Sequence, residues 1–411
     1  MEIFKKVFKQ TSWQLVGKAI SSLSTVFVLS LVSRNFGESG TGVFTLALTY
    51  LSFFVLAVDF GINAYLMPSF LKGDYRLTWR KLFGLRLLLS LSMVVLGLLG
   101  IAVWPDNETF KALSLLGLVV AVTESAIFST SGAIFQSKLR YDLSVLSWSA
   151  GSITILLLVV LFVKTGLGLN SLILSYDIGW LVISFLSLLF VRKYLSDLRP
   201  IFDRDFIRNV FRNAWPISLT LMISTVYFRL DSFILSFYKD LSDVGVYNLS
   251  YSVFQSALVV PTFIMNVLYP IMIASFERSR TIFVSQLIRS SLAMSALGVL
   301  ATLATFFLSP FVIRILTGGK GFLGSVESLQ ILALSFPAYF LSALLMWTLV
   351  TLKRYKAVLV IYFFGFLFNL VTNLVYIPLY SFYAAAWISG ASEYLILISQ
   401  IIILMRSLNK L

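Results

Sequence analysis

Twelve long apolar stretches, joined by segments of alternating charge, constrain this chain more than any other feature. The stretches cover residues 13–33, 42–67, 82–104, 112–135, 142–163, 170–191, 214–238, 246–275, 283–308, 326–351, 355–377 and 383–405. Each is near or above the roughly 20 residues that a helix needs to cross a hydrocarbon core. Because lipid offers no hydrogen-bond partners, such stretches must form helices that satisfy their own backbone. The sequence therefore predicts an all-α integral membrane protein.

Lys and Arg concentrate in every second connecting segment. One alternating set of segments consists of the two terminal tails and every second loop between them. This set holds most of the 32 basic residues and accounts for the net charge of +14, whereas the loops of the other set are close to neutral. Basic loops stay on the cytoplasmic side of a membrane. This alternation predicts twelve crossings of the plasma (inner) membrane with both termini in the cytoplasm. The basicity indicates orientation, so we expect contact with membrane lipids and no nucleic-acid partner.

Composition removes several classes of chemistry. Hydrophobic residues make up 59% of the chain and charged residues 12%, and neither Cys nor His occurs. Without Cys and His there are no disulfides, thiolate metal sites, cysteine nucleophiles or imidazole bases. An enzyme that uses carboxylates alone stays possible, but the sequence holds no motif for one. We therefore expect no enzyme activity, no metal and no cofactor, apart from a coupling H⁺ or Na⁺.

The longest hydrophilic segment, 192–213, lies near the middle of the chain. Its apolar residues Phe202, Phe206, Val210 and Phe211 recur at helical spacing beside Arg and Asp. This pattern predicts an amphipathic linker helix on the cytoplasmic surface, with an ordinary solvated linker helix as the alternative. The segment would separate an N-lobe of six crossings, 1–191, from a C-lobe of six crossings, 214–411.

A short internal echo favours a duplication. The sequence GVFTLALT begins at Gly42 and the similar GVYNLSYS begins at Gly245, 203 residues later. The offset is close to half of the 411 residues, and both copies follow an odd-numbered stretch. An even number of crossings per half gives parallel repeats related by an axis along the membrane normal. The sequence thus predicts two six-helix lobes with a pseudo-two-fold axis.

Charged side chains inside the apolar stretches mark the candidate sites, because charge in hydrocarbon is costly and usually faces a cavity or a partner. The basic candidates for a substrate cavity are Lys18, Arg86 and Arg229, with Arg34 at the outer end of the first stretch. The acidic candidates, as ion-coupling or structural groups, are Asp59, Glu124, Asp231 and Glu393.

Several of these candidates have a plainer interpretation. Lys18 and Arg86 can extend to the headgroups, and Lys18 can form a structural ion pair with Asp59 at similar depth. Arg34 fits an interfacial anchor as well as a partner for Asp231. Glu124 and Glu393 are too short to reach the headgroups, which favours a role in binding a proton or cation.

Proline and asparagine add further marks. Proline removes a backbone donor and kinks a helix, so Pro261, Pro270 and Pro337 are candidate hinges, with static kinks as the alternative. Asn369 and Asn373 lie four residues apart on one helical face. They would either bond a neighbouring helix or line a polar cavity.

The stretch Ser33–Gly61 resembles the first hairpin of the polysaccharide transporter family, which includes O-antigen and lipid-linked oligosaccharide flippases. The matching residues are Arg34, Gly37, Gly42, Phe44, Asp59 and Gly61. A second similar block holds Pro216, Arg229, Asp231, Val244–Tyr247 and Leu268–Pro270, and a third runs from Asn369 and Asn373 through Pro378 and Ala384–Trp387 to Glu393. One departure is Tyr383, which stands where the family usually has the Gly of Gly-Ala-Ala.

The resemblance implies the fold of the multidrug and oligosaccharidyl-lipid exporter superfamily, a MATE-like pair of lobes around a central cavity. It also implies a flippase that moves a polyprenyl-linked oligosaccharide, an O-antigen or polysaccharide precursor, to the outer leaflet by alternating access, beside other polysaccharide-assembly proteins. A MATE-type multidrug antiporter for organic cations is the alternative, although the basic residues within the membrane argue mildly against it. A non-transport protein of envelope assembly is the second alternative.

Overall fold

The computed structural model describes residues 2–59, 61–105, 107–227 and 229–409, with side chains described except at 2–12, 15, 64, 72, 216–227 and 266. These residues form two compact units. The first contains 1–35 and 43–226, and the second contains 36–42 and 227–411. The division into lobes around 192–213 stays a prediction, since helix α7 beyond the linker belongs by its contacts to the first unit.

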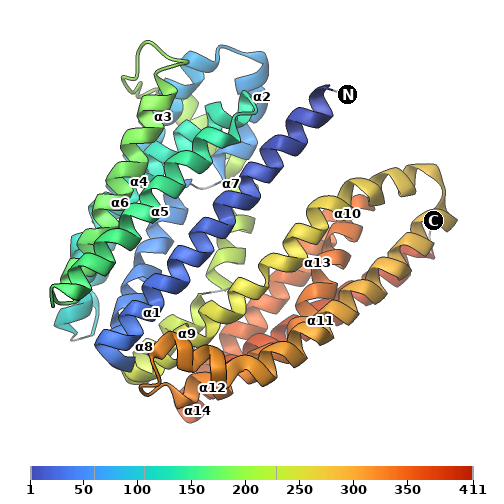
Figure 1. Cartoon of the computed structure of the whole chain (residues 1–411). Helices are drawn as coiled ribbons and strands as arrows, with labels where there is room; N and C mark the ends of the chain where they lie inside the picture. Colours follow the sequence, from blue (N-terminus) through green and yellow to red (C-terminus); the bar gives the residue numbers. More distant parts are fainter. Residues whose placement is uncertain (1, 60, 106, 228, 410–411) are drawn as a thin grey trace. The chain divides into compact units, whose positions relative to one another are not determined.

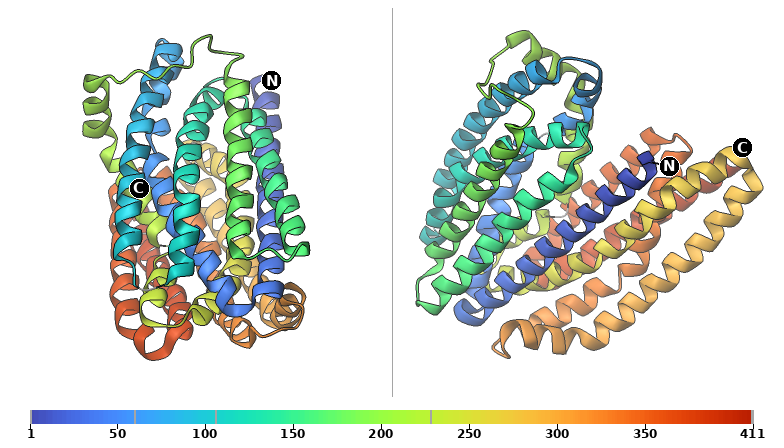
Figure 2. Two further views of the ribbon diagram at one scale, coloured as in Figure 1. Left: turned by 90° about the vertical axis from the view of Figure 1, so that its left-hand side faces the viewer. Right: turned by 45° about the horizontal axis from the view of Figure 1, so that its top comes forward.

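The first unit contains seven helices among the described residues. They are α1 (Glu2–Asp59), α2 (Ile62–Lys72), α3 (Tyr75–Val103), α4 (Glu108–Ser137), α5 (Tyr141–Lys164), α6 (Leu169–Val191) and α7 (Arg204–Tyr227). Residues 36–42 of α1 and the last residue of α7 belong instead to the second unit. Helices α3, α4, α5 and α6 run alongside one another in two views (Figures 1 and 2). Each pair that is consecutive in the sequence is antiparallel, whereas α4 and α6, which also pack against each other, run parallel.

The second unit holds the remaining helices of the described chain. They are α8 (Leu230–Tyr238), α9 (Leu241–Ala257), α10 (Val259–Arg278), α11 (Arg280–Thr317), α12 (Leu323–Ala333), α13 (Phe336–Thr351) and α14 (Tyr355–Leu408). Helix α13 packs against α10, α11 and α14, and α12 packs against α9, α11 and α14.

Two helices are each long enough for two crossings and are sharply broken inside. In α1 the break lies at Gly37 (φ 66°, ψ −166°), and in α14 it lies at Ser381 (φ 53°, ψ −140°). Both residues fall between predicted crossings, and the blue ribbon of α1 turns back there in Figure 1. Each helix therefore consists of two limbs, which account for predicted crossings one and two, and eleven and twelve.

The described helices confirm the fold class. Eight of them are long and apolar enough to cross a membrane, or nine when α12 and α13, bent by 43°, count as one broken span. Leucines exposed along α3 and α11, such as Leu91, Leu99 and Leu292, suit lipid contact rather than water. The chain is a multi-span, all-α membrane protein.

The predicted linker helix does not stand alone. Helix α7 runs without interruption from Arg204 to Tyr227, so it includes the start of the seventh apolar stretch. Phe206 and Val210 pack into a core with Trp79 and Leu82, whereas Phe202 and Phe211 are exposed. One apolar face of this segment therefore packs on its own unit.

Gly42 and Gly245, which begin the two copies of the internal echo, both belong to the second unit and lie close together. A Cβ atom added to Gly42 would lie 1.8 Å from the Leu241 carbonyl oxygen, and one added to Gly245 would lie 2.0 Å from the Glu38 carbonyl oxygen. Glu38 and Leu241 are themselves 203 residues apart, like the glycines. The contact thus has the reciprocal form of a two-fold interface, which supports the predicted duplication.

Candidate functional site

A buried polar cluster surrounds Asp231 in the second unit. Oδ2 of Asp231 accepts hydrogen bonds from the Tyr247 hydroxyl at 2.7 Å and the Ser389 hydroxyl at 2.6 Å. Its Oδ1 accepts a third from Nδ2 of Asn373 at 2.7 Å. The carboxylate is 2% exposed, so its charge depends on these donors. The cluster joins α8, α9 and both limbs of α14.

The amides of α14 extend this cluster. Nδ2 of Asn373 also donates to Oδ1 of Asn369 at 3.0 Å, and Nδ2 of Asn369 donates to Ser392 at 3.3 Å. Both amides are buried. The predicted polar face of Asn369 and Asn373 therefore contacts the other limb of α14 and the Asp231 carboxylate.

The other charged candidates of the second unit, Arg229 and Glu393, have their own partners. Arg229 is partly buried at the start of α8, and its Nη2 donates to Gln255 at 3.5 Å. Glu393 is 2% exposed and accepts a hydrogen bond from Ser342. All three side chains that donate to Asp231 belong to the second unit. Arg34, which the sequence suggested as a partner for Asp231, belongs to the first unit and is exposed.

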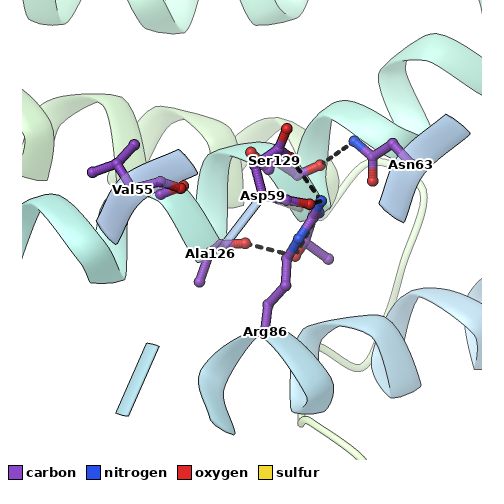
Figure 3. Close-up of polar contacts among 8 residues, drawn as sticks. Val55, Asp59, Asn63, Arg86, Ala126 and Ser129 are labelled. Carbon is purple, nitrogen blue, oxygen red and sulfur yellow. Dashed lines mark hydrogen bonds and ion pairs between the residues drawn. The ribbon is translucent and has the colours of Figure 1, made fainter. Parts of the chain in front are cut away.

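An ion pair anchors a broken helix in the first unit. Nη2 of Arg86, on α3, lies 2.8 Å from Oδ1 of Asp59 and donates to the Asp59 carbonyl oxygen at 3.2 Å (Figure 3). Asp59 ends α1, and Gly61 begins α2 in the left-handed region with φ 60°. Arg86 therefore binds a carbonyl that the helix break leaves without its usual partner.

Helix α4 supplies the other side of this arrangement. Nδ2 of Asn63 donates to the Ser129 carbonyl at 2.8 Å (Figure 3). The Ser125 hydroxyl donates to the Val55 carbonyl at 2.9 Å. Glu124 precedes Ser125 and is 4% exposed, and its Oε1 has no hydrogen-bond partner among the described residues. Such a carboxylate is suited to hold a proton or small cation.

The exposed and buried cations differ in what they can contact. Lys18 and Arg34 are exposed, whereas Arg86 is fully buried and engaged with Asp59. In place of the suggested pair with Lys18, Asp59 pairs with Arg86 in the described part of the chain. Lys18, Arg34 and Arg229 can meet a ligand, and Arg86 can position the α1–α2 break.

The candidate hinge prolines lie at or near helix breaks. Pro261 follows the interruption between α9 and α10 at Leu258, and Pro337 follows the bend between α12 and α13. Both stand in a first turn, where a missing N–H removes no helical hydrogen bond. Pro270 lies inside α10. Their role as hinges stays a prediction.

Sequence reasoning missed three partners. Tyr247 and Ser389 bond to Asp231, and Thr130 contacts Arg86 at 3.4 Å. Tyr247 had a signal, because it belongs to the echo and to the second block of the family pattern. Ser389 and Thr130 are two of many Ser and Thr residues in the apolar stretches, so nothing in the sequence distinguished them.

The described helices and these buried polar clusters define a multi-span, all-α membrane protein. The sequence model of the polysaccharide biosynthesis protein family matches residues 7–276, about two thirds of the chain. The chain belongs to this family, which confirms the resemblance found in the sequence. No curated protein matches it.

Solved structures with the same fold include flippases and multidrug transporters. The lipid II flippase MurJ in an inward closed conformation is 15% identical with a TM-score of 0.77, over 98% of this chain and 89% of that one. An inward-facing MATE family multidrug resistance transporter is 13% identical with a TM-score of 0.75, over 95% and 96%. A MOP superfamily transporter from Pyrococcus furiosus is 12% identical with a TM-score of 0.64, over 98% and 94%. At these identities the likeness establishes the MATE-like fold of that superfamily.

Proposed function

We propose that this protein is a flippase that moves a lipid-linked oligosaccharide from the cytoplasmic to the outer leaflet by alternating access. The observation that carries the proposal is the match of the polysaccharide biosynthesis protein family over residues 7–276. The similarity of nearly the whole chain to a lipid II flippase supports it. The protein would act without catalytic residues, because moving a lipid breaks no covalent bond.

The chemistry of the substrate explains the cations within the membrane. A lipid-linked oligosaccharide carries an anionic phosphate and a polar glycan that would lose their water in hydrocarbon. Lys18, Arg34 and Arg229 are the groups proposed to attract the phosphate, since their side chains are exposed or partly buried. Arg86 is proposed to act through Asp59 at the helix break.

Two sources of energy fit this proposal. An inside-negative potential favours outward movement of an anion by about 2.3 kcal/mol per charge per 100 mV. The buried carboxylates Asp231, Glu393 and Glu124 offer sites for an inward H⁺ or Na⁺, and Asp59 is a further carboxylate beside Arg86. Their role in coupling is part of the proposal.

Translocation in proteoliposomes tests the proposal. Purified protein is reconstituted with a fluorescent lipid-linked oligosaccharide, and a membrane-impermeant glycosidase reports which leaflet holds the glycan. We expect protein-dependent accessibility that Lys18→Ala and Arg229→Ala each lower, while Lys320→Ala in an exposed loop leaves it unchanged. Absence of movement for several glycans would contradict the proposal.

A second candidate function is export of organic cations in exchange for H⁺ or Na⁺. The observation that favours it is the acidic character of the buried clusters around Asp231 and Glu393, together with the MATE-like fold. Export of a cationic dye by the same vesicles, without glycan movement, would select this alternative. Membrane lipids and other polysaccharide-assembly proteins are the expected partners of the flippase.

A further inference from the structure

The turn between the two limbs of α14 carries an open aromatic groove. Tyr376, Leu379, Tyr380, Tyr383 and Trp387 line it, and its volume is about 740 Å³. All five of these side chains are exposed. The rings of Tyr376 and Tyr380 stack, with their centroids 6.4 Å apart and 27° between their planes. The groove therefore presents several ring faces to one small volume.

Three consecutive residues fix the backbone of this turn. The Ser381 hydroxyl donates to Asp243 in the first turn of α9, and the Tyr383 hydroxyl donates to Glu327 on α12. Between them, Phe382 packs on Gly324, where an added Cβ would lie 2.7 Å from the ring. The groove is thus held by contacts to two other helices and does not depend on a ligand for its shape.

The residues that line the groove favour a neutral sugar over an anionic ligand. Its residues include no Lys or Arg, which leaves nothing to neutralise a phosphate. The negative face of an aromatic ring attracts C–H groups of a pyranose, and tyrosine hydroxyls with the neighbouring carboxylates Asp243 and Glu327 can bond to its hydroxyls. An interfacial belt also uses Tyr and Trp, but it requires neither a concave surface nor carboxylates at its edge.

We propose that this groove binds a neutral sugar ring of the glycan head, at the turn between the two limbs of α14, which is predicted to face outward. The inference rests on the proposed flippase function and adds a glycan-binding site to it. The aromatic Tyr383, where the family pattern has Gly, contributes to the groove, so this chain's departure from that pattern creates part of the site.

Saturation-transfer NMR on the full-length protein in lipid nanodiscs tests the groove directly. The probes are methyl α-glucoside, N-acetylglucosamine and maltose, with glucose 1-phosphate as the anionic comparison and empty nanodiscs as the blank. We expect saturation of the ring C–H protons of at least one neutral sugar. Trp387→Ala and Tyr380→Ala should each lower it by about fivefold, whereas Phe364→Ala, an exposed ring elsewhere on α14, should leave it unchanged.

The outcomes separate the groove from the flippase function. No saturation for any neutral sugar, an unchanged signal in both groove variants, or a stronger signal for glucose 1-phosphate overturns the groove. If the wild-type protein flips the lipid-linked oligosaccharide in vesicles while sugars fail to bind, only the groove is wrong. If sugars bind and both groove variants lose the signal while the wild type moves no lipid, the flippase function is wrong and the groove stands.

Discussion

The ion pair between Arg86 and Asp59 has two unequal ends. The guanidinium is fully buried, whereas 41% of the Asp59 side chain stays exposed. Removing the acid would leave an uncompensated charge inside the helices, while removing the base would leave a carboxylate that water reaches. The free energy of unfolding therefore depends more on the presence of Asp59 than its own burial indicates.

We predict that Asp59→Asn lowers the free energy of unfolding by about 3 kcal/mol or more, because Arg86 then stays buried without its counter-charge. Thermal unfolding in detergent measures the change. The double variant Asp59→Asn with Arg86→Met removes both charges at similar volume and should recover most of the loss. A double variant as unstable as the single one would contradict the explanation.

A second prediction concerns the three donors that converge on Asp231. In Asp231→Asn one oxygen becomes an NH₂ group, which must face a hydroxyl or amide that already donates. We expect transport to fall by about tenfold or more and its ion dependence to change, with the protein still folded. Thr372→Val, beside Asn373, removes only a hydroxyl bonded within its own helix and serves as the control. Wild-type rate and ion dependence in Asp231→Asn would refute a functional role for this carboxylate.

The residue-scale candidates show how far sequence reaches. Topology gives the depth of each charge, which is why Asp59 and Lys18 were candidates for one pair. Depth does not give rotation about the helix axis, so the sequence could not tell that Arg86 faces Asp59 instead. The bonds from Asn373 and Ser389 to Asp231 join residues 142 and 158 positions apart, which no local spacing predicts.

At the scale of elements, the segment before α7 is bound to the first turns of α3. Arg80 pairs with Asp197 at 3.0 Å, and Lys81 pairs with Asp203 at 2.6 Å. The N–H of Ile201 donates to the Arg80 carbonyl at 3.0 Å. Hydrogen bonding from Lys81 lowers the pKa of Asp203. The linker is therefore fastened to its unit by ions that are ordinarily charged at neutral pH.

The sign of this pKa shift gives a pH prediction. A carboxyl group with a lowered pKa in the folded protein adds stability above its unfolded pKa, near 3.9, and loses it as the pH falls through the lower folded value. Amide exchange of the segment around Ile201 should stay constant from pH 7 to 5, after correction for intrinsic rates, and rise only in more acid solution.

The variant Asp203→Asn should reproduce the acid state at neutral pH. We expect exchange in this segment to become several-fold faster, because the charged contact to Lys81 is gone. Asp205→Asn, an exposed acid two residues on, is the matched control and should exchange like the wild type. Equal rates in both variants would show that Lys81 and Asp203 do not hold the linker.

Element boundaries were partly predictable. Hydropathy located the apolar stretches, because a membrane imposes one length on each. It did not show that α1 and α14 keep helical geometry almost to their breaks, or that α7 begins as early as Arg204. Those boundaries depend on Gly37, on Ser381 and on the packing of Phe206 and Val210. Hydropathy is averaged over many residues, so it does not reveal the effect of single ones.

At the scale of the whole molecule, the absence of cysteine makes orientation directly measurable. Because the sequence has no other thiol, a single introduced cysteine is the only site that a maleimide can label. Exposed Lys193 and Lys353 are predicted to face the cytoplasm, and exposed Lys164 and Lys320 the outside.

We predict that an impermeant maleimide added to intact cells labels Lys164→Cys and Lys320→Cys but reaches Lys193→Cys and Lys353→Cys only after permeabilisation. The charge bias of the loops is the physical reason. Labelling after permeabilisation confirms that each cysteine is accessible at all. Outside labelling at Lys353 would reverse the predicted position of the termini.

The reciprocal contact of Gly42 and Gly245 has a consequence for the history of the chain. If two copies of a six-helix protein once paired as separate subunits, a residue near their symmetry axis met its own counterpart. One glycine then left room for a partner carbonyl on both sides. Fusion of the two genes would have turned that single position into two. A substitution of one glycine would now block only one of the two close contacts. In the ancestral pair, the same substitution would have blocked both.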